Sequence, residues 1–258
     1  VSLGIGVSMA GPMVLPAIAL AGLVAMCNGL NSAQLAANHP VSGGTYEYGH
    51  RWLNPSLGFV AGWMFLCAKS ASAATAALGF ALYLAPDHQI PVALGTVALT
   101  TSITLTGMQR SNTVNALIVG AVLLALLAFV ALGAPAIGAH PERWQTTLQP
   151  GQFGQLLPTA ALMFVAFTGY GRIATLGEEV TEPRRTIPRA VLTTLILSML
   201  LYIGVAWVSL ANAENEIGSL ANLAEEFSGS TLGKVMLVAA AIAMVSVLLN
   251  LVLGLSRV

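Results

Sequence analysis

Charged side chains are scarce in this sequence: they make up 8% of its 258 residues, against 56% hydrophobic residues. So few charges cannot cover the surface of a soluble protein of this size, and the mean hydropathy of +0.81 agrees. The sequence therefore predicts an integral membrane protein. Its formal net charge of zero, without a basic stripe, gives no reason to expect a nucleic-acid partner.

Residues that build disulfides, metal sites and enzyme centres are also few. Cys27 and Cys67 lie inside apolar runs, where a free thiol behaves as a small hydrophobe, so no disulfide framework or metal site is indicated. The four histidines fall in joints between apolar stretches and lack metal-ligand spacing. The chain has no H-E-x-x-H, no G-x-S-x-G and no phosphate-binding glycine loop. We expect no metal, no cofactor and no enzyme, with an intramembrane hydrolase as a poor second class.

Apolar stretches of roughly 20 residues, enough to cross the hydrocarbon core as helices, recur along the whole chain. We expect one partial helix, halted by Gly11 and Pro12, and seven full ones. Their approximate ranges are 1–10, 13–38, 57–84, 92–106, 113–137, 154–180, 187–211 and 231–257. The expected fold class is all-α integral membrane, with a single transmembrane domain over residues 1–258.

Basic residues in the joints predict the orientation of the chain. If the joints alternate between the two sides of the membrane, one side carries only Arg143 and Lys234. The other side carries Arg51, Arg110, Arg184, Arg185, Arg189 and Arg257. The positive-inside rule places this second group in the cytoplasm. We therefore expect the joints between helices two and three, four and five, and six and seven to be cytoplasmic, in a plasma or inner membrane.

The helix expected at 154–180 contains a break. Its apolar run LMFVAFTGYGR, residues 162–172, is interrupted at TGYG, which is Thr168 to Gly171. Irregular main chain at membrane depth persists only where protein, water or a ligand supplies partners, because each unpaired N–H or C=O in hydrocarbon costs several kcal/mol. Glycine allows the break and lets a ligand approach the backbone closely. The break indicates either a ligand site or a glycine kink packed against a neighbouring helix.

A broken helix offers free backbone groups of two kinds. The carbonyls that end its first half, here those of about Val165, Ala166, Phe167 and Thr168, suit an ammonium group. The N–H groups that begin its second half, from about Gly171 onward, suit a carboxylate. An α-amino acid carries both ions, so the break predicts a site for a zwitterion.

Four stretches resemble the amino acid-polyamine-organocation (APC) permeases. VAFTGYGRIATLGEEVTEPRRTIPRAV, residues 165–191, is similar to the family's sixth-helix signature, a Gly-aromatic break followed by E-E-V, P-R-R and I-P-x-A. ANHPVSGGTYEYGHRWLNPSLGFVAGW, residues 37–63, resembles its joint between helices two and three. Weaker matches are GMQRSNTVN, residues 107–115, at the start of helix five, and LLNLVLGLSRV, residues 248–258, at the end of helix eight.

The resemblance implies a LeuT-like fold, in which two five-helix repeats of inverted topology carry a substrate site where their first helices are broken. Residues 1–137 would form most of repeat one and residues 154–258 the first three helices of repeat two. The first half of helix one, which holds much of the carboxylate site in relatives, and the helices from the ninth onward are expected to be absent. We interpret the chain as an incomplete permease.

Gly169 and Tyr170 match the family's glycine and the aromatic that follows it, but two neighbours depart from its pattern. Val165 stands where several relatives have a gating aromatic, and Gly171 where many have an acidic residue. Both departures open space and remove charge, so we expect a neutral or apolar amino acid rather than arginine or a polyamine. Phe167 is the remaining aromatic candidate for a lid over the substrate, with plain helix packing as the alternative.

The sequence identifies the coupling ion less clearly than it identifies the substrate site. In some relatives a lysine on helix five takes the place of a sodium ion, but that position is Val122 here. Lys69 is the only lysine inside an apolar span, and a charge at that depth suggests a function by default. It could carry a coupling proton, or it could have a structural partner or reach a wet cavity. Ser246, on helix eight, is a weaker candidate for a sodium site.

The joint EEVTEPRRTIPR, residues 178–189, follows the broken helix and is rich in charge of both signs. Its candidates for a cytoplasmic gate, made of ion pairs that close the inner vestibule, are Glu178, Glu179, Arg184 and Arg185. The alternative is a solvated joint that serves only topology.

Together these observations predict a secondary active transporter of amino acids that works by alternating access, either proton-coupled or as an exchanger. The expected partners are the amino acid, membrane lipid and a coupling ion, H⁺ or Na⁺. The alternative function is a non-transporting amino-acid sensor or an inactive truncated permease.

Overall fold

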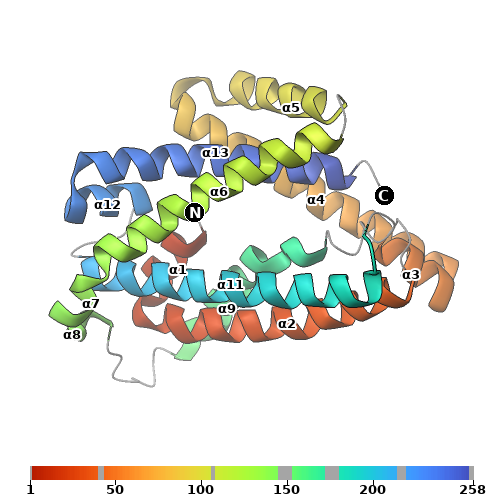
Figure 1. Ribbon diagram of the computed structural model, residues 1–258, viewed down its shortest axis with the longest axis horizontal. Coiled ribbons are helices and arrows are strands. Elements are labelled where there is room, and N and C mark those ends of the chain that lie inside the picture. The colour runs from red at the N-terminus through yellow and green to blue at the C-terminus, as the bar shows by residue number, and fades with distance from the viewer. Residues whose placement is uncertain are drawn as a thin grey trace. The chain divides into compact units, whose positions relative to one another are not determined.

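The computed structural model describes residues 2–39, 44–105, 108–144, 153–171, 180–213 and 219–255 (Figure 1). Within these ranges the secondary structure is helical and contains no strand. The longer helices are α1 (Ser2–Ala10), α2 (Val14–Asn38), α3 (Thr45–Trp52), α4 (Pro55–Leu84), α5 (Gln89–Leu105), α6 (Met108–Gly133), α9 (Phe153–Phe167), α11 (Pro183–Asn212), α12 (Leu220–Ser228) and α13 (Ser230–Leu255). The short elements are η1 (Gly11–Met13), η2 (Pro86–His88), α7 (Pro135–Ala139), α8 (Pro141–Trp144) and η4 (Thr168–Tyr170).

Five helical segments in the described part of the chain are long and apolar enough to cross a membrane: Ser2–Asn38, Pro55–Leu84, Thr113–Ala139, Pro183–Asn212 and Ser230–Leu255. The all-helical membrane class expected from composition is thereby confirmed. The other two expected spans are not among these five: where they are described, α5 has 17 residues, at the lower limit for a crossing helix, and α9 has 15.

The first helix ends just before Gly11 and Pro12, as the sequence predicts. The α-helix α1 ends at Ala10, and the chain passes through the 3₁₀ turn η1 before α2 begins at Val14. Gly11 adopts a φ of +52°, a left-handed conformation that glycine accepts without a steric cost. Pro12 follows inside the turn, where its fixed φ suits a helix start.

The chain divides into two compact units, and each draws on both halves of the sequence. Unit 1 contains α1, α2, α7, α8, α9, η4, α11 and α12, together with α6 from Ala125 and α13 up to Met236. Unit 2 contains α3, α4 and α5, together with α6 up to Leu124 and α13 from Leu237.

In unit 1, α2 packs against both α11 and α9. Its buried side consists mostly of small residues, which let helices approach closely in lipid. A Cβ added at Gly22 would lie 2.7 Å from Met199 Sδ, and one at Gly29 would lie 2.9 Å from Leu195 Cδ1. Both neighbours belong to α11, so these two glycines set the distance between α2 and α11.

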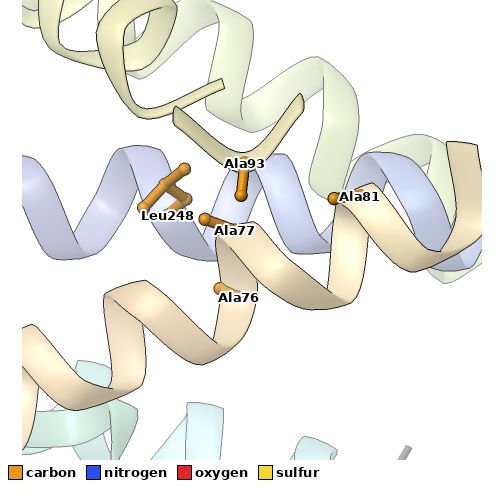
Figure 2. Close-up of a cluster of buried hydrophobic side chains, with 5 residues drawn as sticks. All are labelled: Ala76, Ala77, Ala81, Ala93 and Leu248. Atoms are coloured by element: carbon orange, nitrogen blue, oxygen red, sulfur yellow. The ribbon is translucent and has the colours of Figure 1, made fainter. Parts of the chain in front are cut away.

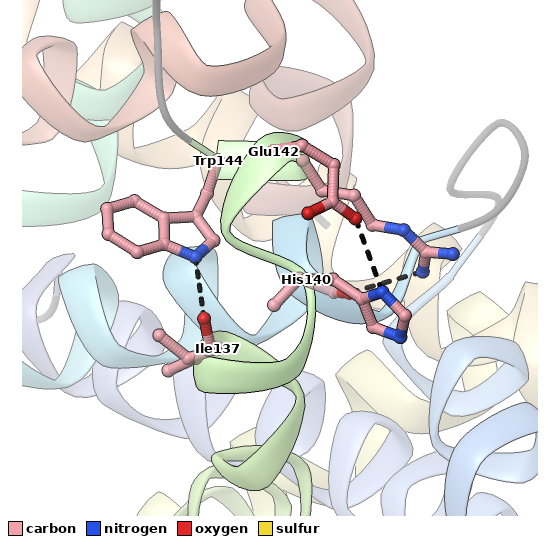
Figure 3. Close-up of polar contacts among 6 residues, drawn as sticks. Ile137, His140, Glu142 and Trp144 are labelled. Atoms are coloured by element: carbon pink, nitrogen blue, oxygen red, sulfur yellow. Dashed lines mark hydrogen bonds and ion pairs between the residues drawn. The ribbon is translucent and has the colours of Figure 1, made fainter.

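The end of unit 1 formed by α7, α8 and the end of α11 is held by polar and aromatic contacts. Figure 3 shows the Trp144 indole N–H donating to the Ile137 carbonyl at 2.9 Å and His140 Nδ1 beside Glu142 Oε1 at 3.3 Å. The backbone N–H of Glu142 and the neighbouring His140 hold the pKa of the Glu142 carboxyl below its usual range. The Trp144 ring meets Trp207 of α11 edge-on, with centroids 5.0 Å apart.

In unit 2, α4 packs against α3 and α5. Figure 2 shows the small core of this unit, in which Leu248 of α13 meets alanines of α4 and α5: Ala76, Ala77, Ala81 and Ala93. At the other contact, the backbones of α3 and α4 nearly touch. A Cβ added at Gly58 would lie 2.5 Å from the His50 backbone nitrogen, and one at Gly49 would lie 2.9 Å from Gly58 Cα.

Candidate functional site

The α-helix α9 ends at Phe167, inside the segment where the sequence predicts a break. The next three residues, Thr168 to Tyr170, form the 3₁₀ turn η4. The flanking residues keep right-handed backbone angles, with φ −92° and ψ −10° at Phe167 and φ −58° and ψ −23° at Gly171. From Phe167 to Gly171 the main chain is therefore a tightened right-handed spiral and is not extended.

Side chains around the turn face in different directions. Phe167 and Tyr170 are buried, at 3% and 9% exposure, whereas Val165 is 60% exposed. Gly169 is exposed as well, and no described atom would lie within 4 Å of a Cβ added at Gly169 or Gly171. The glycine side of the turn thus leaves the main chain approachable.

The two buried aromatic residues rest on the glycines of α2. A Cβ at Gly22 would come within 3.5 Å of Phe167 Cζ, and a Cβ at Gly29 within 3.6 Å of Tyr170 Cγ. Phe167 also meets the ring of Tyr202 on α11 edge-on, with centroids 5.2 Å apart. Packing between helices therefore explains the position of the Phe167 side chain. The sequence left this open as the alternative to a lid over the substrate.

Two hydrogen bonds from other helices reach the turn. Asn28 Nδ2 of α2 donates to the Tyr170 hydroxyl at 2.7 Å. The Tyr202 hydroxyl of α11 donates to the Ala166 carbonyl at 3.2 Å. The Thr168 hydroxyl of η4 donates back to the Val165 carbonyl of α9 at 2.8 Å. Two of the carbonyls that the sequence assigns to a substrate ammonium therefore each receive a hydroxyl hydrogen from the protein itself.

The coupling candidates both lie in unit 2. The half-buried Lys69 places its Nζ 5.7 Å from the centroid of the Phe65 ring, one helical turn earlier in α4. Ser246 is buried in α13, and its hydroxyl donates to Asn115 Oδ1 of α6 at 2.6 Å. The same oxygen accepts from Asn250 Nδ2 at 2.6 Å. Ser246 thus belongs to a polar contact between α6 and α13.

The gate candidates are only partly within the described residues. Glu178 and Glu179 lie outside them. Arg184 and Arg185 are exposed in the first turn of α11, and Arg185 Nη1 lies 3.8 Å from Glu182 Oε2. These two side chains are 77% and 74% exposed, so their ion pair contributes little stability.

Sequence reasoning missed the residues that support the turn from outside α9. Asn28 carries a usable signal, because a polar side chain inside an apolar run at membrane depth needs a partner. Asn115 carries the same signal at the start of its apolar run. Tyr202, Gly22 and Gly29 carry none, since tyrosine and glycine are ordinary residues of transmembrane helices.

Comparison with known proteins gives a match over the whole chain. The family model described as "Amino acid permease" matches residues 1–258. An uncharacterized transporter of Mycobacterium tuberculosis is 38% identical over 253 residues, which cover 96% of this chain and 57% of that protein.

Two relatives with named substrates are more distant. The branched-chain amino acid permease BcaP of Bacillus subtilis is 26% identical over 227 residues, covering 79% of this chain and 48% of BcaP. The methylthioribose transporter of the same organism is 27% identical over 246 residues, covering 85% of this chain and 52% of that protein. The chain thus spans about half the length of these relatives.

Proposed function

Since this chain belongs to the amino acid permease family, we propose that the protein it represents is a secondary transporter of a small neutral amino acid that works by alternating access. Its apolar helices make it a multi-pass membrane protein, and its relatives are named as transporters rather than enzymes. The observation that carries the proposal is the end of α9 at Phe167, followed by a turn where a Cβ added at Gly169 or Gly171 would meet no described atom within 4 Å.

The turn offers main-chain groups that match an amino acid. The last carbonyls of a helix generally lack α-helical partners and carry partial negative charge that attracts an ammonium. The helix α9 ends at Phe167, and the Thr168 carbonyl accepts from the Gly171 N–H within the turn. The substrate site comprises the main chain of residues 165–171, from Val165 to Gly171. Because a carbonyl has two lone pairs, that of Val165 can accept from a substrate in addition to the Thr168 hydroxyl.

The lack of charged side chains within residues 165–171 supports a neutral substrate. Val165, Gly169 and Gly171 add neither a carboxylate for a cationic side chain nor bulk that would exclude an aliphatic one. The relatives that are named for their substrates agree. Branched-chain amino acids have uncharged side chains, and methylthioribose carries no charge.

The composition of the two units supports the inverted repeats. Unit 1 joins α1 and α2 with α9 and α11, which are the first two helices of each proposed repeat. Unit 2 joins α4 and α5 with most of α13, which are the later helices of the same repeats. Alternating access in such folds is largely rigid-body movement of one group of helices against another.

Uptake into proteoliposomes that contain the full-length protein tests this function. We expect leucine, valine or alanine to accumulate and to compete with one another, with arginine and putrescine at least about tenfold weaker as competitors because residues 165–171 contain no carboxylate. Empty liposomes are the control. Uptake that is flat for every amino acid with a folded protein rejects transport, and stronger competition by arginine or putrescine rejects the neutral substrate.

Lys69 is the proposed carrier of a coupling proton. We expect the Lys69→Met substitution to abolish amino acid accumulation driven by a pH gradient while exchange across the membrane persists, because methionine keeps the packing on Phe65 but carries no proton. Lys234→Met, at an exposed lysine of α13, is the matched control and should leave accumulation unchanged. Accumulation by Lys69→Met at the wild-type level would remove Lys69 from the coupling mechanism.

A further inference from the structure

The contact between Tyr202 and α9 brings a side chain of one helix to the main chain of another. The Tyr202 hydroxyl donates to the Ala166 carbonyl, which belongs to the last turn of α9. The other hydroxyl at this point, that of Thr168, makes a bond three residues back along its own helix, as helical threonine commonly does. Thr96, Thr100 and Thr104 make such local bonds in α5. Local helix geometry therefore explains the hydrogen bond from Thr168 but not the one from Tyr202.

The first part of the explanation is the cost of an unpaired backbone carbonyl at membrane depth. A carbonyl at the end of an interrupted helix loses its α-helical partner, and an unpaired carbonyl is costly in hydrocarbon because no water can take the partner's place. When no substrate is bound, a hydroxyl from α11 gives the Ala166 carbonyl a partner. The Tyr202 ring is fixed for this purpose by its edge-on contact with Phe167.

The length of the bond supplies the second part. Its donor and acceptor oxygens are 3.2 Å apart, beyond the 2.5–3.0 Å usual for a hydroxyl donor. A charged ammonium makes shorter and stronger hydrogen bonds to a carbonyl than a neutral hydroxyl does. A substrate ammonium that reaches the Ala166 carbonyl would therefore outcompete the Tyr202 hydroxyl.

We propose that the Tyr202 hydroxyl occupies the place of the substrate ammonium in the empty site and is displaced when an amino acid binds. This inference rests on the proposed function, because it assumes that the substrate ammonium binds the carbonyls at the end of α9. Tyr202 is then a positioning residue that stabilises the turn without substrate and lowers the affinity for any ligand that carries an ammonium. Ligands without an ammonium leave the bond intact.

Removal of the hydroxyl has a characteristic effect on ligand binding. In the Tyr202→Phe variant, leucine no longer competes with an internal donor, so its dissociation constant should fall about two- to tenfold. The amine 3-methylbutylamine, which is leucine without its carboxylate, should gain by the same factor. The acid 4-methylpentanoate, which is leucine without its amine, should not gain.

The test uses the full-length protein in detergent, with competition against radiolabelled leucine and thermal unfolding without ligand. Tyr83→Phe, which removes a hydroxyl from α4 in unit 2, is the matched control. Tyr202→Phe should lower the melting temperature of the ligand-free protein below that of Tyr83→Phe, because the hydrogen bond from Tyr202 to the Ala166 carbonyl is lost. The dissociation constant for leucine, and not the melting temperature, shows whether removal of the hydroxyl raises or lowers the affinity.

The outcomes separate this role from the proposed function. Weaker or unchanged leucine binding in Tyr202→Phe, or an equal gain for 4-methylpentanoate, would overturn the role of Tyr202 and leave transport standing. An unchanged melting temperature relative to Tyr83→Phe would also overturn it. A wild-type protein that binds no neutral amino acid would reject the proposed function and this role together.

Discussion

Replacing Gly169 by leucine should reduce amino acid uptake at least about tenfold while the protein keeps its fold. Gly169 is exposed in the 3₁₀ turn, and no described atom would lie within 4 Å of a Cβ there. A leucine side chain can therefore be accommodated by the protein, but it would fill the space through which a substrate approaches the main chain. Initial uptake rates of the variant in proteoliposomes measure the effect, and its melting temperature in detergent shows whether it folds.

Gly120→Leu is the matched control for this prediction. Gly120 lies in α6, where no described atom would lie within 4 Å of an added Cβ. The substitution adds the same bulk to a transmembrane helix outside the proposed site, so uptake should stay close to the wild-type rate. Full uptake by Gly169→Leu would mean that the open side of the turn faces lipid and not substrate.

Replacing Gly58 by alanine should destabilise the protein by about 3 kcal/mol, at the upper end of the range for overpacking. The added Cβ would lie 2.5 Å from the His50 backbone nitrogen and 2.7 Å from His50 Cα. Backbone atoms cannot rotate away as a flexible side chain can, so α3 must shift from the start of α4. For a chain of this size we expect a melting temperature lower by about 6 to 12 °C.

Gly95→Ala provides the comparison, because an added Cβ in that part of α5 would meet no described atom within 4 Å. Its melting temperature should be no lower than that of the wild type and within about 1 °C of it. Alanine has a higher helix propensity than glycine, so the replacement does not destabilise an exposed helical position. Equal melting temperatures for Gly58→Ala and the wild type would show that α3 does not lie against α4 as the structure places it.

The sequence predicts the interruption of α9 because Gly169 and Gly171 flank one aromatic residue inside an apolar run. It does not predict that the main chain tightens into a 3₁₀ turn, since that choice depends on neighbouring helices. Phe167 and Tyr170 keep their positions by resting on Gly22 and Gly29. Such contacts join residues far apart in the chain, and no local pattern identifies them.

The lengths and ends of the apolar helices were easier to predict than the helices against which they pack. The stop at Gly11 follows from the local chemistry of glycine and proline, and the structure has it. The grouping of α1 and α2 with α9 and α11 could not be read from hydropathy, because every apolar helix has the same signal along the chain. The support that Asn28 and Tyr202 give to the turn became evident only from their hydrogen bonds.

The central claim is that the main chain at the end of α9 binds the ammonium of a neutral amino acid. An experimental structure of the full-length protein with leucine bound tests it most directly. The account predicts the leucine nitrogen within about 2.7–3.2 Å of one or more carbonyls of residues 165–168. Leucine bound elsewhere, with those carbonyls contacted only by protein, would contradict it.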